Sequence, residues 1–194
     1  MKEKGYRLNV GLVIADKQGR VLLCKRKGMN SWQFPQGGID LNESSLKAAK
    51  RELFEEVGIK SKDVKLIKSL EEWLKYDIPT KSRRRNILNK NFKGQKQKWF
   101  LFKLQNDVQV SFENDPDNEF DDFKWVSYWY PLNVIVSFKE KVYFEALNQL
   151  KYSFCEEFLR DEEEPERSSF RGLLFLSSKG SFAKFPGKTQ SIQC

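Results

Sequence analysis

Residues 37–59 read GGIDLNESSLKAAKRELFEEVGI, and this stretch determines how the rest of the chain is interpreted. From Ser44 to Val57, apolar residues recur every three or four positions, which predicts an amphipathic helix. Ser44 or Ser45 is placed to cap the start of this helix. Gly58 is placed to end it, because glycine adopts the left-handed backbone conformation that other residues resist.

The same spacing gathers Glu52, Glu55 and Glu56 on the helix face next to the apolar stripe. Like charges one turn apart repel each other, so such a cluster costs helix stability unless a cation joins it. Carboxylate oxygens are the ligands that Mg²⁺ and Mn²⁺ prefer, often beside substrate phosphates. A solvated charged face would have the same composition, so the glutamates alone leave both interpretations open.

The flanks of the helix favour the metal site. Gly37 and Gly38 predict a loop whose backbone can approach a ligand closely, because neither residue carries a Cβ. Glu43 and Arg51 are spaced to form an ion pair between this loop and the helix. The whole stretch resembles the Nudix box, G-x5-E-x7-R-E-U-x-E-E-x-G-U, without a mismatch. The chain is therefore similar to the Nudix hydrolases.

Outside this stretch the sequence predicts mostly strands, followed by a closing helix that contains Val142 and Phe154. Strands with one central and one terminal helix predict an α/β domain whose helices cover a mixed sheet. The Nudix resemblance sharpens this to an α/β/α sandwich over residues 1–159. Residues 160–194 read as a charged linker and a tail that we expect to be disordered, with a docking arm as the alternative. The expected strands are 6–15, 21–26, 64–73, 99–104, 107–112 and 123–127.

Composition limits the chemistry. The chain of 194 residues contains no histidine, so carboxylates must serve as both general base and metal ligand. It has no Cys-x-x-Cys pair, so no zinc site is indicated. A net charge of +8 favours a polyanionic partner. No apolar run approaches the length of a membrane span, so we expect a cytoplasmic protein.

A second informative stretch, residues 81–98, contains eight Lys or Arg and no acidic residue. Aromatic residues flank it, with Trp73 and Tyr76 before it and Trp99 and Phe100 after it. Basic charge beside aromatic rings suits single-stranded nucleic acid, because cations follow the phosphates and rings stack on bases. A solvated surface loop is the alternative.

Several segments narrow the resemblance to the bacterial RNA pyrophosphohydrolases, which are close kin of the dinucleoside polyphosphate hydrolases. The resemblance implies that pyrophosphate is removed from the 5′-triphosphate end of RNA, leaving a monophosphate that exposes the transcript to decay. A dinucleoside polyphosphate hydrolase and a non-catalytic nucleic-acid-binding module remain alternatives. Neither a membrane nor DNA is an expected partner. The segments are 6–11, 31–38, 94–100, 125–131 and 136–139.

The resemblance also implies roles for individual residues. One carboxylate of the metal-binding set would act as the general base, and the sequence does not assign it. One departure from the usual pattern is Asn42, which stands where glycine is usual and tolerates left-handed backbone. The implied ligands of Mg²⁺, or of Mn²⁺ as the alternative, are Gly37, Glu52, Glu55, Glu56 and Glu119, and the four glutamates are the implied catalytic residues. The implied substrate residues are Arg7, Arg26, Tyr76, Gln95, Val136, Phe138 and Lys139, and the implied structural residues are Glu43, Arg51 and Gly58.

Overall fold

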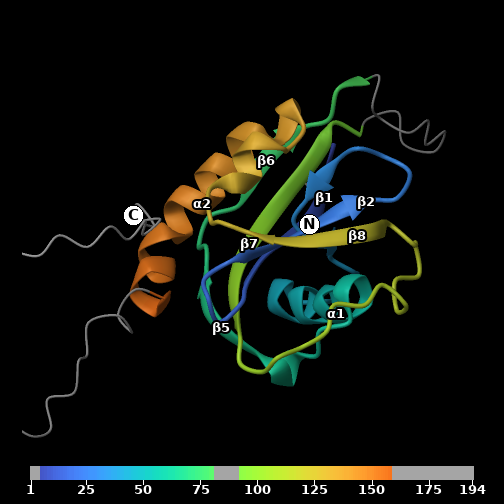
Figure 1. Cartoon of the computed structure of the whole chain (residues 1–194). Helices are drawn as coiled ribbons and strands as arrows, with labels where there is room; N and C mark the ends of the chain where they lie inside the picture. The colour runs from blue at the N-terminus through green and yellow to red at the C-terminus, as the bar shows by residue number, and fades with distance from the viewer. Residues whose placement is uncertain (1–4, 81–91, 159–194) are drawn as a thin grey trace, which may run out of the picture.

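The computed structural model describes residues 5–80 and 92–158. In this part of the chain an eight-stranded sheet lies between two helices (Figure 1). The strands are β1 (Tyr6–Ala15), β2 (Val21–Arg26), β3 (Trp32–Gln33), β4 (Gln36–Gly38), β5 (Val64–Ser69), β6 (Leu74–Asp77), β7 (Gly94–Leu104) and β8 (Phe120–Val126). The helices are α1 (Ser45–Val57) and α2 (Ser137–Phe158), with 3₁₀ turns η1 (Ser61–Asp63) and η3 (Tyr130–Asn133).

The sheet is mixed. Its central strands β1 and β7 are parallel and stay in register from the pair Tyr6↔Gly94 to the pair Ala15↔Lys103. The other pairings are antiparallel. Strand β1 pairs with β2 only near their shared turn, and β4 pairs with β1 farther along. The short strand β4, which carries Gly37, therefore lies beside the middle of β1.

Helix α1 forms where the sequence predicts it. The Ser44 side chain accepts a hydrogen bond from the backbone N–H of Lys47, with the two atoms 3.2 Å apart. At the other end Gly58 adopts a left-handed φ of 71°, and its N–H donates to the carbonyl of Phe54. The buried face, which includes Leu53, packs on the residues of β1 and β7 that point to this side of the sheet. The caps define the ends of α1, and the packing of its apolar stripe sets which way the glutamates point.

Helix α2 covers the opposite face of the sheet (Figure 1). Its Tyr143 stacks on Phe34 with ring centroids 5.2 Å apart and meets the edge of Trp99 at the same distance. The Tyr143 hydroxyl also accepts a hydrogen bond from the backbone N–H of Phe34. This packing anchors α2 on the sheet, and the first turn of the helix carries Phe138 and Lys139.

The predicted α/β architecture is confirmed, and the first two strands have the predicted bounds. Strand β7 begins at Gly94 rather than at residue 99, and β8 covers Phe120–Val126 rather than 123–127. The strand predicted over 64–73 ends at Ser69 and is followed by a turn into β6. Turns at residues 113–114 and 116–117 precede β8, and Asn118 has a φ of 49°.

Two local predictions are wrong. Residues 107–112 form no strand, although their sequence alternates. Val110 is buried against the α1 side of the core, and Ser111 N donates to the carbonyl of Val57, so the segment packs as an irregular connection. Gly37 and Gly38 belong to strand β4 instead of a loop. Both glycines pair with residues of β1. Because neither carries a Cβ, neighbouring side chains can lie directly against their backbone.

Residues 81–91 and the expected tail from 159 onward lie outside the described residues. The predicted basic segment and the predicted domain boundary therefore stay predictions. Within residues 5–80 and 92–158, neither helix combines the length and the apolar character that crossing a membrane requires.

Candidate active site

Two of the three α1 glutamates are buried beside strand β4. Glu52 and Glu56 are 7% and 5% exposed, whereas the Glu55 side chain is 34% exposed. The Glu56 carboxylate accepts a hydrogen bond from the backbone N–H of Gln36, with 2.7 Å between Oε2 and N. The Glu52 carboxylate lies so close to Gly37 that a Cβ there would collide with it. Glycine at this position lets the chain pass directly over the glutamate.

Arg51 lies at the centre of the charged cluster. Its guanidinium bonds both oxygens of Glu43, with Nε–Oε1 and Nη2–Oε2 distances of 3.1 and 3.0 Å. Nη2 also donates to the carbonyl of Gly38 at 2.7 Å, and Nη1 donates to both Glu52 and Glu55 at 2.7 Å. The ion pair predicted between Glu43 and Arg51 is thus present. Arg51 also supplies the cation that relieves repulsion between two glutamates of the helix.

The electrostatics of the buried glutamates are unfavourable without such a cation. Burial raises the pKa of Glu56, and repulsion from Glu52 and Glu119 raises it further. Burial also raises the pKa of Glu52, although the hydrogen bond from Arg51 acts in the opposite direction. Carboxylates in this environment gain from a nearby positive charge, because it offsets both desolvation and repulsion.

The donor set fits a hard divalent cation. It consists of carboxylates next to the backbone of Gly37, and oxygen ligands of this kind are those that Mg²⁺ and Mn²⁺ take. In the part of the chain that is described, no three acidic, histidine or cysteine side chains lie close enough together to form a complete metal site. Arg51 Nη1 bridges an oxygen of Glu52 and an oxygen of Glu55, which holds these two carboxylates around the guanidinium.

Glu119 reaches the cluster from the residue before β8. Its carboxylate is 3.7 Å from Nη2 of Arg26, and its charge raises the pKa of Glu56. The backbone around it is fixed, because Glu119 N donates to Asp115 Oδ2 at 2.5 Å and Lys27 N donates to the carbonyl of Glu119 at 2.7 Å. The structure therefore brings Glu119 near the α1 glutamates, as the resemblance implied.

Lys139 is the most unusual of the predicted substrate residues. Its Nζ is buried and donates to Oε1 of Gln33 at 2.9 Å and to Oε1 of Gln36 at 3.2 Å. It also lies 5.6 Å from the ring centroid of Tyr76. Burial lowers the pKa of Lys139 from 10.5 to about 7, and the nearby positive charge of Arg26 contributes.

Four further predicted substrate residues surround this lysine or the first turn of its helix. The Tyr76 hydroxyl donates to Oε1 of Gln95 at 2.7 Å, and the Tyr76 ring lies 6.0 Å from the ring of Phe138. The carbonyl of Val136 accepts a hydrogen bond from the backbone N–H of Lys139, which begins α2. Residues from β6, β7 and α2 thus lie together. We call Tyr76, Gln95, Val136, Phe138 and Lys139 the predicted substrate groove.

Arg7 occupies a different place. Its guanidinium lies against Gly38, where a Cβ would collide with it, and its positive charge opposes the rise in the pKa of Glu52. Arg7 therefore lies close enough to Glu52 for their charges to interact. Asn42, in the turn before α1, adopts a φ of 64°, the left-handed conformation expected where glycine is usual. The functional roles of all these residues stay predictions.

Sequence reasoning missed a buried amide network between the groove and the glutamates. Gln97 Nε2 donates to Oδ1 of Asn9 at 2.7 Å and to Oε1 of Gln36 at 3.2 Å. Gln36 Oε1 also accepts from Lys139, and Gln36 N bonds Glu56, so Gln36 joins the groove to the carboxylates. The available signal was Asn9, a polar residue at an inward position of the mostly apolar first strand, whereas Gln97 lies before the predicted start of β7.

A family comparison agrees with this geometry. The model of the NUDIX domain matches residues 5–145, which is most of the chain and includes every predicted site residue. This chain belongs to the NUDIX family.

Individual NUDIX relatives are similar over most of their own length. A protein named RNA pyrophosphohydrolase from Pasteurella multocida is 47% identical over 150 residues, covering 75% of this chain and 73% of that protein. A protein of the same name from Vibrio cholerae is 45% identical over 169 residues, covering 87% and 97%. One from Francisella tularensis subsp. mediasiatica is 46% identical and covers 77% and 96%.

Solved structures support the NUDIX fold alone, because their sequence identities are low. The E. coli dihydroneopterin triphosphate pyrophosphohydrolase matches with a TM-score of 0.60 and 24% identity, covering 75% of this chain and 97% of that one. A C. elegans Ap4A hydrolase in a binary complex matches with a TM-score of 0.56 and 22% identity, covering 75% and 98%.

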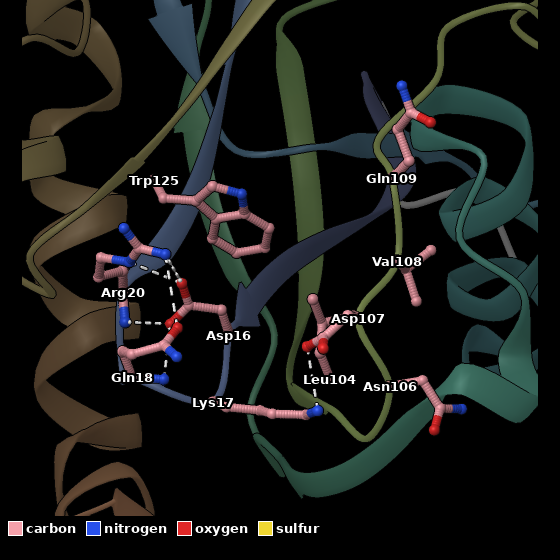
Figure 2. Close-up of a pocket in the computed structure, with 10 residues that line it drawn as sticks. All are labelled: Asp16, Lys17, Gln18, Arg20, Leu104, Asn106, Asp107, Val108, Gln109 and Trp125. Atoms are coloured by element: carbon pink, nitrogen blue, oxygen red, sulfur yellow. Dashed lines mark hydrogen bonds and ion pairs between the residues drawn. The ribbon is translucent and has the colours of Figure 1, made fainter.

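A hollow of about 350 Å³ lies away from the NUDIX glutamates, at the turn between β1 and β2 (Figure 2). Its charged side chains are already paired with one another. Arg20 Nη2 lies 2.6 Å from Asp16 Oδ2, and Lys17 Nζ lies 3.0 Å from Asp107 Oδ1. Trp125 forms part of its wall. With its cations neutralised in this way, the hollow is a poor site for a polyphosphate.

Proposed function

We propose that this NUDIX chain is an RNA 5′-pyrophosphohydrolase. It removes pyrophosphate from the 5′-triphosphate end of RNA and leaves a 5′-monophosphate, which promotes decay of the transcript. The observation that carries the proposal is the identity of 45–47% to proteins named RNA pyrophosphohydrolase, over 73–97% of their lengths. The C. elegans Ap4A hydrolase shares only the fold, so it does not favour a dinucleoside polyphosphate as the main substrate.

We infer that the cation is Mg²⁺, with Mn²⁺ as the alternative, held by Glu52, Glu55, Glu56 and Glu119 with the carbonyl of Gly37. A bound divalent cation neutralises phosphate charge and lowers the pKa of water. One of the four carboxylates takes a proton from the attacking water as the water oxygen bonds to phosphorus. The phosphoanhydride bond then breaks, and pyrophosphate leaves while the monophosphate stays on the RNA.

The groove residues bind and orient the RNA end. Arg7, Arg26 and Lys139 provide positive charge beside the carboxylates, where the polyphosphate must lie. Phe138 is partly exposed and provides a ring face for a base near the 5′ end, since unpaired bases of RNA stack on aromatic side chains, and the buried ring of Tyr76 supports it from behind. Tyr76 and Gln36 both donate to the oxygen of the Gln95 amide, which orients its NH₂ group as a donor for a base edge or a ribose hydroxyl.

The deciding experiment compares kcat/KM for a 5′-triphosphorylated RNA and for a dinucleoside tetraphosphate, each with Mg²⁺. We expect the RNA to be the better substrate, with pyrophosphate as the released product. A preference for the tetraphosphate would overturn the proposal in favour of a small-molecule hydrolase. Binding of RNA without turnover of either substrate would identify a non-catalytic module. Because transcripts are the proposed substrate, we place the protein in the cytoplasm and expect no role for DNA.

A further inference from the structure

Strand β7 presents different chemistry on its two faces. Gln95 and Gln97 take part in the groove and its amide network, and the alternation of a strand places Lys96 and Lys98 on the opposite face. Lys96 pairs directly with Lys75 of β6, whose neighbour Tyr76 likewise points into the groove. Lysines from two adjacent strands therefore gather on the α1 side of the sheet.

Two aromatic residues lie among these lysines. The ring centroid of Trp73 is 5.8 Å from Nζ of Lys96 and 5.8 Å from Nζ of Lys98. The ring centroid of Tyr6 is 5.5 Å from Nζ of Lys75. All five residues are at least partly accessible to solvent. We call this surface the back-face strip: Tyr6, Trp73, Lys75, Lys96 and Lys98.

The back-face strip contains one cross-strand pair of like charges. Like charges directly opposite each other on adjacent strands are destabilising, and Lys75 and Lys96 form such a pair. The ring contacts of Trp73 and Tyr6 offset part of this repulsion. Two hydrogen bonds hold other members of the strip in place: Tyr6 donates to Oδ1 of Asp77, and Lys98 donates to the backbone carbonyl of Glu71. The strip thus places three lysines beside two aromatic rings.

We propose that the back-face strip binds the single-stranded part of the substrate RNA downstream of its 5′ end. This inference rests on the proposed function. Lysines would contact successive phosphates while Trp73 and Tyr6 stack on bases, which is how proteins hold single strands without reading sequence. Among the described strands β6 pairs only with β7. Tyr76 and Lys75 are neighbours on β6 and face opposite sides of the sheet. RNA that leaves the groove at Tyr76 therefore has to pass only around the edge of β6 to reach Lys75.

The test separates binding from turnover. Affinity for a 5′-hydroxyl RNA of twenty nucleotides is measured by fluorescence anisotropy at several salt concentrations, and KM is measured for triphosphorylated RNAs of three and twenty nucleotides. The variant Lys75→Gln/Lys96→Gln removes two charges of the strip. Lys60→Gln/Lys62→Gln, at exposed lysines after α1, is the matched control. Lys75→Arg/Lys96→Arg retains the charge, and circular dichroism melting checks that each variant folds.

We expect the strip variant to raise KM for the long RNA only and to flatten the log–log salt dependence of binding by about 1.4, since each phosphate contact contributes about 0.7. The Arg variant and the control should keep the wild-type slope. Trp73→Ala should weaken binding of the long RNA by about fivefold to a hundredfold, the loss that one stacked base represents.

Three outcomes would overturn the proposal. The strip variant would bind the long RNA with the slope of the control, or it would raise KM equally for both RNA lengths. In the third outcome, the strip variant would bind RNA as wild type does but would no longer bind polyglutamate in a parallel anisotropy measurement. That result would identify the strip as a surface for acidic proteins. Absence of turnover by the wild-type protein would count against the proposed function alone, because the anisotropy arm measures the strip without chemistry.

Discussion

Arg51 Nη1 lies 2.7 Å from Oε1 of Glu52 and 2.7 Å from Oε2 of Glu55, so one nitrogen bridges two glutamates of the predicted metal site. The rest of the guanidinium is held by Glu43 and by the carbonyl of Gly38. Arg51 therefore has partners besides Glu52 and Glu55, the predicted metal ligands. If a cation binds those two carboxylates, Glu43 and the Gly38 carbonyl would still hold the arginine between the β4 strand and α1.

Replacing Arg51 by Ala should destabilise the metal-free protein by about 2–5 kcal/mol, because Glu43 and Glu52 lose their partner while remaining largely buried. Urea denaturation in the presence of a chelator measures this. Lys17→Ala is the matched control, since its ion pair with Asp107 is exposed and should matter by about 1 kcal/mol or less. A loss for Arg51→Ala no larger than that of the control would contradict the central role of the arginine.

Glu56→Gln should leave the fold intact and lower kcat on triphosphorylated RNA by about 10²–10⁴, the range for losing a positioned acid–base or metal-activating group. The folded-state pKa of Glu56 is raised, so its ionisation costs stability as the pH rises above the ordinary value of 4.5. The variant should therefore melt at a higher temperature than wild type at pH 7 without metal. Near-normal turnover would place the catalytic centre elsewhere.

Lys139 should make RNA binding depend on pH. Its pKa is lowered to about 7, so the side chain loses its charge as the pH rises through that value, and attraction for phosphates falls. We expect KM for RNA to rise above pH 7 in wild type, and to show no such rise in Lys139→Gln. A profile unchanged by the substitution would show that another group titrates.

The same lysine gives a stability prediction of definite sign. Between pH 7 and 10.5 the unfolded chain binds a proton at Lys139 that the folded protein releases, so stability increases with pH across this window. Lys139→Met should remove that increase. Thermal melting of both proteins at pH 7 and pH 9 compares the slopes, and identical slopes would count against the lowered pKa.

A chain that ends at Leu159 should fold and hydrolyse RNA at a rate comparable with the full chain. Every predicted site residue precedes that point, and α2 ends at Phe158. Melting temperature and kcat/KM for both chains provide the comparison. A large loss of activity or solubility would mean that residues 160–194 dock onto the domain.

Local sequence signals predicted α1 well because its caps and its apolar stripe depend on nearby residues. Ser44 and Gly58 act within one turn of the helix ends, as the sequence suggested. The segment 107–112 shows the limit of the same reasoning. Alternation there places Val110 against the core, but a strand also requires a free edge to pair with, and that depends on distant residues.

For the candidate site, too, the sequence predicts what depends on nearby residues and misses what depends on distant ones. The spacing of Glu52, Glu55 and Glu56 on one helix face follows from the sequence. The contacts by which Gln36 connects the lysine to the glutamates do not. Gln36 contacts residues from β7 and α2, so its partners become neighbours only after the sheet and both helices have assembled. For the same reason the sequence assigned Trp99 and Phe100 to the surface beside the basic stretch, although both are buried in the core.

The parallel pairing of β1 with β7 has a consequence for synthesis on the ribosome. Asn9 and Gln97, which hydrogen-bond across these strands, are 88 residues apart in sequence. The first strand therefore emerges long before its central partner, and α1 emerges before the sheet that it covers. Pairings between distant segments also fold slowly. The nascent chain must keep the apolar face of β1 from aggregating until β7 arrives, which makes this protein a candidate client for chaperones that bind emerging chains.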